Sequence, residues 1–221
     1  MSKIKVAIQG ELGAYSHIAV ERLYKDAVIK TCSTFEETFK QAYNDPSYKI
    51  VIPIENSLAG RVADIHYLLP KYKLQIHGEY FLPVEHNLLG KPGTNIEDIK
   101  YVRSHAQAIS QCQNIISNQK FKPIISVDTA GSAKDLAEGK DKSIAAIASN
   151  LSAQMYNLKI LKKNIEDEKG NVTRFLIMGK NIEQPEYTSD KKFITSCIFR
   201  VKSEPSALYK SLGGFATNQI N

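Results

Sequence analysis

Short apolar runs alternate with amphipathic stretches along residues 1–180. An apolar run of strand length followed by a stretch of helical period is typical of a β–loop–α unit. The runs that predict strands cover 6–8, 28–32, 49–53, 100–103, 123–127, 144–148, 158–165 and 173–178. The stretches that predict helices cover 15–25, 34–44, 62–69 and 104–118, with two more that start near 128–132 and at 149 or 150. This alternation predicts an α/β fold with doubly wound layers.

Several helix ends are marked by single residues. Thr34 is followed by Glu37, and Ser104 by Gln107, and both pairs have the spacing of a capping box. Pro70 is expected to end a helix, because the residue before a proline is biased away from the helical conformation.

The order of the predicted elements indicates two lobes. Residues 1–75 and 160–180 are expected to form the first lobe, and 76–159 the second. The β-rich stretch 74–89 is expected to cross between them. A polar linker, 181–192, separates this body from a tail.

Bulk composition agrees with an ordinary globular protein. The chain has 221 residues, 43% hydrophobic and 24% charged, enough for two compact units. Its longest apolar runs are too short to span a bilayer. A strand pattern begins at Lys3, so we expect no signal peptide and a cytoplasmic location.

Charge and cysteine usage exclude further classes. The net charge is +6, but the Lys and Arg residues are dispersed, which is typical of solvated faces rather than of a track that follows phosphates. We therefore expect no nucleic-acid or membrane partner, and a mild positive potential that suits a small anionic substrate. The three cysteines and five histidines lack metal-ligand spacing, so no metal is expected.

Five predicted strands end in polar loops of small residues that open helices. They are Gln9–Ser16, Glu55–Gly60, Ser104–Gln107, Asp128–Ser132 and Ala148–Ser149. Ligands bind at the carboxyl ends of strands in open α/β sheets, and helix N-termini there suit carboxylates. For any single loop, the interpretation of these residues as N-caps and turn formers is favoured over ligand binding. Five such loops in two lobes favour a cleft that binds an anion.

Read together, the loops resemble the prephenate dehydratase family. The segments that carry the resemblance are Gln9-Gly-Glu-Leu-Gly-Ala-Tyr-Ser16, Val51-Ile-Pro-Ile-Glu-Asn-Ser-Leu-Ala-Gly60, Ser104-His-Ala-Gln-Ala-Ile-Ser-Gln-Cys112, Asp128-Thr-Ala-Gly-Ser-Ala-Lys134, Ala145-Ala-Ile-Ala-Ser149 and Asn171-Val-Thr-Arg-Phe175. The resemblance implies two α/β lobes of the periplasmic-binding-protein kind, with the substrate in the cleft. It also implies the decarboxylating dehydration of prephenate to phenylpyruvate in phenylalanine biosynthesis, without a cofactor.

The resemblance ties Thr173 most closely to catalysis. Prephenate loses CO2 and its 4-hydroxyl while its ring becomes aromatic, so the protein must orient it and assist the departing oxygen. A threonine hydroxyl is a weak acid, so Thr173 is expected to donate a hydrogen bond. Glu55 and Asp128 are candidate proton sources if burial raises the pKa of either carboxyl. The alternative is that Glu55 simply holds its loop.

The remaining candidates would bind the substrate. They are Ser16, Asn56, Ser57, Gln111, Thr129, Ser132, Ser149, Arg174 and Phe175. Arg174 would pair with a carboxylate, or else belongs to a structural ion pair. Phe175 would contact the ring, or else lies in the core.

The tail, residues 193–221, resembles the start of an ACT domain, the ferredoxin-like module that binds phenylalanine in this family. A strand is expected over 193–201, then a helix over 203–215 with Pro205 in its first turn, then entry to a second strand. The effector site would be incomplete here, so the chain should ignore phenylalanine. A homo-oligomer is expected for the full-length form.

Two other functions remain open. A two-lobed solute-binding or sensor protein would share the fold without catalysis. Within the enzyme class, arogenate replaces the keto group of prephenate by an amino group, and no residue of the sequence distinguishes the two substrates.

Overall fold

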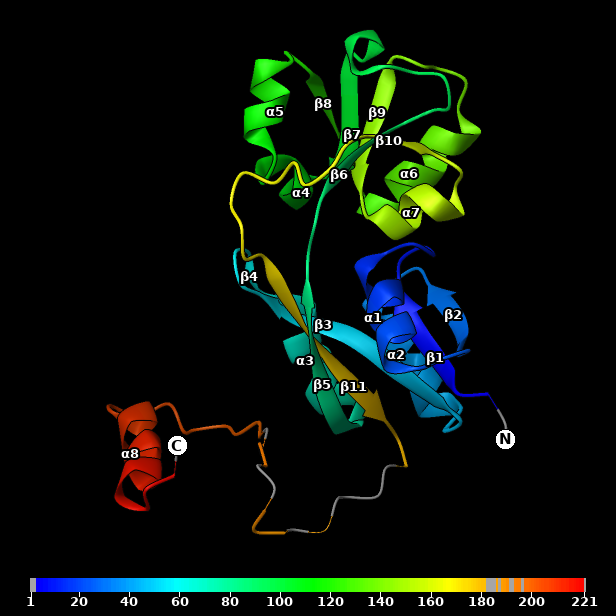
Figure 1. The fold of residues 1–221 in the computed structure, drawn as a ribbon. Coiled ribbons are helices and arrows are strands. Elements are labelled where there is room, and N and C mark those ends of the chain that lie inside the picture. Colours follow the sequence, from blue (N-terminus) through cyan, green and yellow to red (C-terminus); the bar gives the residue numbers. More distant parts are fainter. Residues whose placement is uncertain (1–2, 182–185, 187, 191–192, 196, 221) are drawn as a thin grey trace. The chain divides into compact units, whose positions relative to one another are not determined.

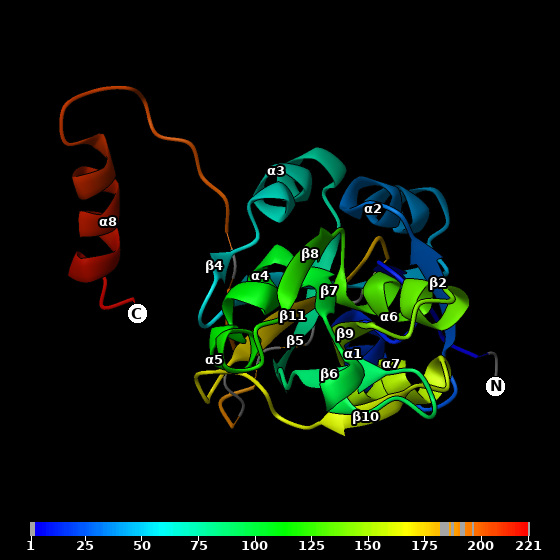
Figure 2. The same cartoon turned by 90° about the horizontal axis from the view of Figure 1, so that it is seen from above.

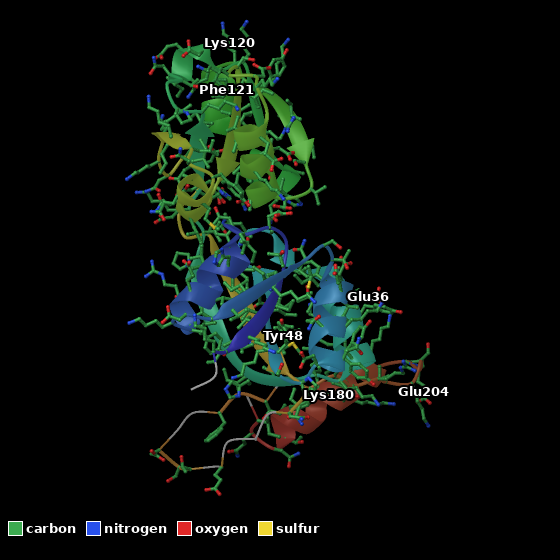
Figure 3. All side chains as sticks on the ribbon, turned by 90° about the vertical axis from the view of Figure 1, so that its right-hand side faces the viewer. Glu36, Tyr48, Lys120, Phe121, Lys180 and Glu204 are labelled. Atoms are coloured by element: carbon green, nitrogen blue, oxygen red, sulfur yellow. The ribbon has the colours of Figure 1, made fainter. Side chains whose placement is uncertain are left out.

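The computed structural model describes residues 3–181, 186, 188–190, 193–195 and 197–220. The chain divides into two compact units, 1–184 and 185–221. The larger unit contains two sheets, each covered by helices on both faces (Figure 1). In Figure 3 the first lobe is marked by Glu36 and Tyr48, and the second by Lys120 and Phe121 at the opposite end of this unit.

The first sheet has the strand order β2-β1-β3-β11-β5, with β4 paired to β3. Its strands are β1 (Lys5–Gln9), β2 (Val28–Cys32), β3 (Tyr48–Asn56), β4 (Gly60–Arg61), β5 (Gln75–Pro83) and β11 (Val172–Gly179). Strands β2, β1 and β3 are parallel, whereas β11 runs antiparallel to both β3 and β5. Helix α1 (Tyr15–Leu23) packs on one face through apolar residues that include Val20. Helices α2 (Phe35–Asn44) and α3 (Ala63–Tyr72) cover the other face.

The second sheet has the order β10-β6-β9-β7-β8. Its strands are β6 (Asn87–Gly90), β7 (Tyr101–His105), β8 (Lys122–Ser126), β9 (Ile144–Ala148) and β10 (Lys159–Lys162), with the 3-10 turn η1 (Ile96–Asp98) before β7. The helices are α4 (Ala106–Ser110), α5 (Gln113–Asn118), α6 (Thr129–Glu138) and α7 (Asn150–Met155). Figure 2 shows α4 and α5 on one side of this sheet and α6 and α7 on the other. The predicted two-lobed α/β fold is confirmed.

The sequence assigned two strands to the wrong sheet. Strand β5 was placed in the second lobe, but it pairs with β11 at the edge of the first sheet. Strand β10 was placed in the first lobe, but it pairs with β6 in the second. Both belong to the stretches around the lobe crossings, where period-2 patterning identifies a strand but not its partner.

Two predicted helix boundaries also differ. Pro70 does not end its helix, because α3 continues to Tyr72. Pro70 lies in the last turn, where its missing N–H removes one bond to the carbonyl of exposed His66. The expected helix over 104–118 is broken into α4 and α5 at Gln111 and Cys112.

The capping pairs behave differently. Thr34 caps α2 by accepting from the backbone N–H of Glu37, as predicted. Ser104 does not cap its helix, since it lies within β7 and donates to the carbonyl of Ile147 instead. The N-cap of α4 is His105, whose Nδ1 accepts from the N–H of Gln107.

The two segments that cross between the lobes are hydrogen-bonded to each other (Figure 1). The N–H of Val84 donates to the carbonyl of Asn171 at 2.8 Å, and the N–H of Ile165 donates to the carbonyl of His86 at 2.8 Å. The crossing therefore brings His86 and Asn171 together from positions far apart in the sequence.

In the smaller unit the described residues form one helix, α8 (Ala207–Thr217). The described residues of the stretch 193–201, where a strand was expected, are not assigned to a strand. Pro205 precedes α8 rather than lying inside it, and the helix continues to Thr217, into the stretch 216–221 where entry to a second strand was expected. The predicted linker lies largely outside the described residues. Across the part of the chain that is described, every helix is too short or too polar to cross a bilayer.

Candidate active site

Side-chain amides form a continuous hydrogen-bonded chain where β3 and β11 meet the lobe crossing. The Nδ2 group of Asn56 donates to Oγ1 of Thr173 at 2.9 Å and to Oδ1 of Asn171 at 2.5 Å. The Nδ2 group of Asn171 in turn donates to Oε1 of Gln111 at 3.0 Å. Three segments more than 50 residues apart, from both lobes, are joined in this way.

The direction of these bonds determines what each group can still do. Both hydrogens of the Asn56 amide are used, and its Oδ1 accepts from the N–H groups of Leu58 at 3.0 Å and Ala59 at 2.9 Å. Thr173 Oγ1 accepts from Asn56, so its own hydrogen remains available for another acceptor. Thr173 is thus oriented as a donor, whereas Asn56 serves to orient it.

Gln111 is held by a second buried pair. Its Oε1 lies 2.9 Å from Nε2 of His86, and because an amide oxygen only accepts, that ring nitrogen carries the hydrogen. Nδ1 of His86 lies 2.9 Å from the Tyr15 hydroxyl, which also lies 2.7 Å from the carbonyl of Glu85. With its oxygen occupied by Asn171 and His86, Gln111 has both amide hydrogens left to donate.

Burial favours the neutral forms of His86, Tyr15 and Cys112, which lie in or beside this network. It lowers the pKa of His86, although the Gln111 bond and the charge of Glu166 oppose the shift. Burial also raises the pKa of Tyr15 well above its ordinary value. The pKa of the neighbouring Cys112 thiol is raised by burial to about 12, which leaves it protonated at neutral pH.

The lowered pKa of His86 predicts a specific loss of stability on acidification. A neutral ring is favoured in the folded state, so the unfolded chain binds more protons and stability rises with pH. This contribution is fully present above about pH 6.5, the unfolded value, and is lost as pH falls through the lower folded pKa. The thermal midpoint of the wild type should therefore fall more between pH 7 and 5 than that of His86→Gln.

Burial also lowers the pKa of His17 and His77, and these rings titrate in both proteins, so the difference between the two slopes isolates His86. Equal slopes in the two proteins would show that folding does not lower the pKa of His86.

A pocket of about 580 Å³ opens beside this network, within the range of about 300–1,000 Å³ for small-molecule sites. Its walls come from the loop between β3 and β4, from α4 and the residue after it, and from the segment before β11. The lining residues are Leu58, Ala59, Ala106, Gln107, Ser110, Gln111, Asp167 and Glu168. Gln111 lines the pocket directly, whereas Thr173 is connected to it through its bond to Asn56, in the strand next to the loop of Leu58 and Ala59. Among the described residues, no group of three His, Cys, Asp or Glu side chains is arranged to hold a metal ion.

The glycine loop and Ser149 contact each other. Ser149 Oγ donates to the carbonyl of Gly13 at 2.6 Å, Ser152 Oγ donates to the same carbonyl at 3.0 Å, and the Tyr156 hydroxyl donates to Leu12 at 2.8 Å. Gly13 has φ +91°, and a Cβ there would lie 2.7 Å from Ser152 Oγ, so only glycine suits the position. These loops join the lobes instead of presenting donors to the pocket.

Three other candidates belong to the start of α6. Asp128 is its N-cap and accepts from the N–H of Gly131 at 2.6 Å. Ser132 is fully buried and its Oγ donates to the carbonyl of Asp128 at 2.7 Å. Thr129 is the first residue of the helix. The side-chain bonds of Asp128 and Ser132 therefore belong to the start of the helix, as the capping interpretation of this loop predicted.

Glu55 and Arg174 lie on the opposite face of the first sheet from Thr173, because successive side chains of a strand alternate. Arg174 donates through Nε to Glu79 at 2.7 Å and through Nη1 to Glu55 at 3.2 Å. Its guanidinium also lies 5.9 Å from the ring of Phe81. The structural ion pair, rather than a substrate carboxylate, occupies Arg174.

The last three candidates are structural in different ways. Phe175 is 1% exposed, inside the core against α1. Ser57 accepts from the N–H of Val172, the first residue of β11, at 2.9 Å and donates to the carbonyl of Gly170 at 3.1 Å. Ser16 is buried in α1. The structure thus joins Thr173, Asn56 and Gln111 in one side-chain network, with Ser57 beside it but bonded to the backbone.

Sequence reasoning missed Asn171, His86 and Tyr15 as parts of the site. Asn171 had a usable signal, since it lies two residues before Thr173 and strand alternation puts both on one face. His86 and Tyr15 had none, because their meeting depends on the fold of both lobes.

This two-lobed α/β fold, with a pocket at the lobe crossing that Gln111 lines, is typical of a small-molecule binding protein or enzyme. Residues 6–183 match the family described as prephenate dehydratase. The chain belongs to the prephenate dehydratase family.

Relatives of known sequence and structure agree. The chain is 39% identical over 98% of its length to a bifunctional N-acyl-homoserine lactone acylase/prephenate dehydratase of Komagataeibacter europaeus, of which it spans 76%. It is 39% identical to arogenate dehydratase/prephenate dehydratase 1, chloroplastic, of Arabidopsis thaliana, matching over its whole length and spanning 56% of the plant protein. The solved prephenate dehydratase of Staphylococcus aureus subsp. aureus Mu50 superposes with TM-score 0.76 at 27% identity, over 98% of this chain and 80% of that one.

Proposed function

We propose that this chain converts prephenate to phenylpyruvate, CO2 and water, with Thr173 donating a hydrogen bond to the departing 4-hydroxyl. The observation that carries the proposal is the direction of the Asn56–Thr173 bond, which leaves the threonine hydrogen for the substrate. As the bond to the ring carboxylate breaks, its electron pair enters the ring and the C4–O bond breaks. The departing hydroxide takes up one proton and becomes water.

Gln111 would bind a substrate carboxylate. Its two amide hydrogens are available at the pocket wall, and its orientation is set by Asn171 and His86 before any ligand arrives. A donor that needs no rearrangement stabilises charge more effectively than a mobile one. Glu55 is ion-paired with Arg174 on the other face of the sheet and Asp128 caps α6, which favours a proton source other than these two carboxyls.

Turnover tests this function directly. Purified protein is incubated with prephenate, and phenylpyruvate is followed by its absorbance in alkali. Formation at a rate proportional to protein concentration supports the proposal. Saturable prephenate binding without any phenylpyruvate would favour the alternative of a solute-binding or sensor protein.

One feature of the pocket favours arogenate as a second substrate. Asp167 and Glu168 line it, and Glu168 has no bond to another described residue. Arogenate carries an ammonium where prephenate carries a keto group, and a carboxylate attracts the former only. The Arabidopsis relative is named for both dehydratase activities.

Glu168→Gln should therefore lower kcat/KM for arogenate about tenfold relative to prephenate, the scale of one lost charge-assisted contact. Both substrates are measured with the same preparation. Glu97→Gln, an exposed glutamate that does not line the pocket, is the matched control and should leave the ratio unchanged. An unchanged ratio in Glu168→Gln would remove the basis for this preference.

We further propose that residues 193–221 belong to a segment of the ACT kind, and that the protein is a homo-oligomer located in the cytoplasm. A solved relative from Arthrobacter aurescens is described as a complex with L-Phe, and it shares the fold with TM-score 0.83 at 24% identity.

A further inference from the structure

The break between α4 and α5 is filled by a side chain from the lobe crossing. Asp167 Oδ2 accepts from the N–H of Gln113 at 2.7 Å, and its Oδ1 accepts from the N–H of Asn114 at 3.0 Å. These N–H groups open α5 and have no partner within the helix. The first N–H groups of α5 are thus bonded by a carboxylate from more than 50 residues away, and not by the side chain of the N-cap residue, Cys112.

Asp167 also holds the residue before the break. Its backbone N–H donates to the carbonyl of Gln111 at 2.7 Å. Within the helix expected over 104–118, that carbonyl would have accepted from Ile115. Asp167 therefore bonds on both sides of the joint that carries Gln111, with its backbone before the joint and its carboxylate after it.

We infer that Asp167 is a positioning residue that acts through Gln111. By keeping the joint at Gln111 and Cys112 open, Asp167 places the Gln111 side chain between Asn171 and His86 with its amide hydrogens toward the pocket. The role rests on the proposed dehydratase function and adds to it a residue that acts without touching the reacting atoms. The negative charge of the Asp167 carboxylate also interacts favourably with the dipole of α5 at its N-terminus, which strengthens these two hydrogen bonds.

A double-mutant cycle tests this role. Asp167→Ala should lower kcat/KM for prephenate about tenfold or more, since misplacing a binding group by about 1 Å has effects up to 100-fold. In the Gln111→Ala background the same change should have less than about a twofold effect, because the group that Asp167 positions is gone. Equal effects in both backgrounds would overturn the inference.

Conservative variants separate positioning from direct chemistry. Asn and Ser accept helix N–H groups about as well as Asp, so Asp167→Asn and Asp167→Ser should keep most of the activity that Asp167→Ala loses. Activity of Asp167→Asn as low as that of Asp167→Ala would mean that the charge itself acts on the substrate, against this inference. Thr34→Ala is the matched control, since it removes the N-cap of α2 and should lower thermal stability similarly with kcat/KM unchanged.

A measurement independent of turnover completes the test. In Asp167→Ala, the amides of Gln113 and Asn114 should exchange hydrogen faster, and the side-chain amide resonances of Gln111 should shift. Unshifted Gln111 resonances would overturn the inference even if the wild type proved inactive. An inactive wild type with the expected shifts would contradict the dehydratase proposal alone.

Discussion

Replacing Thr173 by alanine should lower turnover with prephenate by about 100-fold, the scale for removing one positioned donor to a transition state. Because Thr173 Oγ1 accepts from the Asn56 amide, the hydroxyl hydrogen stays available for an acceptor on the substrate. Removing the hydroxyl leaves the departing oxygen of the substrate without that bond. Single-turnover and steady-state rates with prephenate measure the loss, and circular dichroism confirms that the variant is folded.

Thr173→Ser is the matched variant. It keeps the hydroxyl and the acceptor for Asn56, so it should retain most of the turnover lost in Thr173→Ala. Thr31→Ala, on an exposed position of β2, controls for the loss of any threonine and should be fully active. A folded Thr173→Ala protein with wild-type turnover would show that the donor is another group.

Phe175→Ala should lower the free energy of unfolding by about 3–5 kcal/mol, the range for removing a buried phenylalanine ring. Phe175 is 1% exposed and belongs to the apolar cluster that includes Ile8 and Leu82. The vacated volume lies between the first sheet and α1, where neighbouring side chains are already close-packed. Denaturant unfolding, with the slope compared between variants, measures the change.

Two controls distinguish a core role from contact with the substrate ring. Phe175→Leu keeps most of the buried apolar area, so it should lose less stability and retain kcat/KM. Phe81→Ala removes a phenylalanine that is 54% exposed and should cost less than about 1 kcal/mol. If Phe175→Leu were stable but strongly impaired with prephenate, Phe175 would belong to the site.

Local sequence patterns predicted the structure correctly where a hydrogen bond joins residues only a few positions apart. The Thr34 cap of α2 was predicted because its partner, Glu37, is three positions away. The Ser104 prediction failed although its spacing was the same, since β7 extends to His105 and its pairing with β8 and β9 keeps Ser104 in the strand. Identical spacing thus had two outcomes, decided by whether a neighbouring strand competed for the residue.

The candidate site shows the same division. The motifs contained Thr173, Asn56 and Gln111, and the structure brings these three into one hydrogen-bonded chain through Asn171. The motifs also contained Arg174, which strand alternation sends to the opposite face. The type and order of the residues therefore indicated which reaction to expect. The sheet face on which each side chain lies then decided which of the candidates come together.

The sequence by itself determined the α/β class, most strand and helix positions and the family, because periodicity and motif order are local properties of the chain. The tertiary structure alone decided which sheet receives β5 and β10, where α4 gives way to α5, and how His86 and Asn171 meet Gln111. Each of these depends on a hydrogen bond between segments distant in sequence. Such partners are chosen by the packing of the whole fold, which no short pattern records.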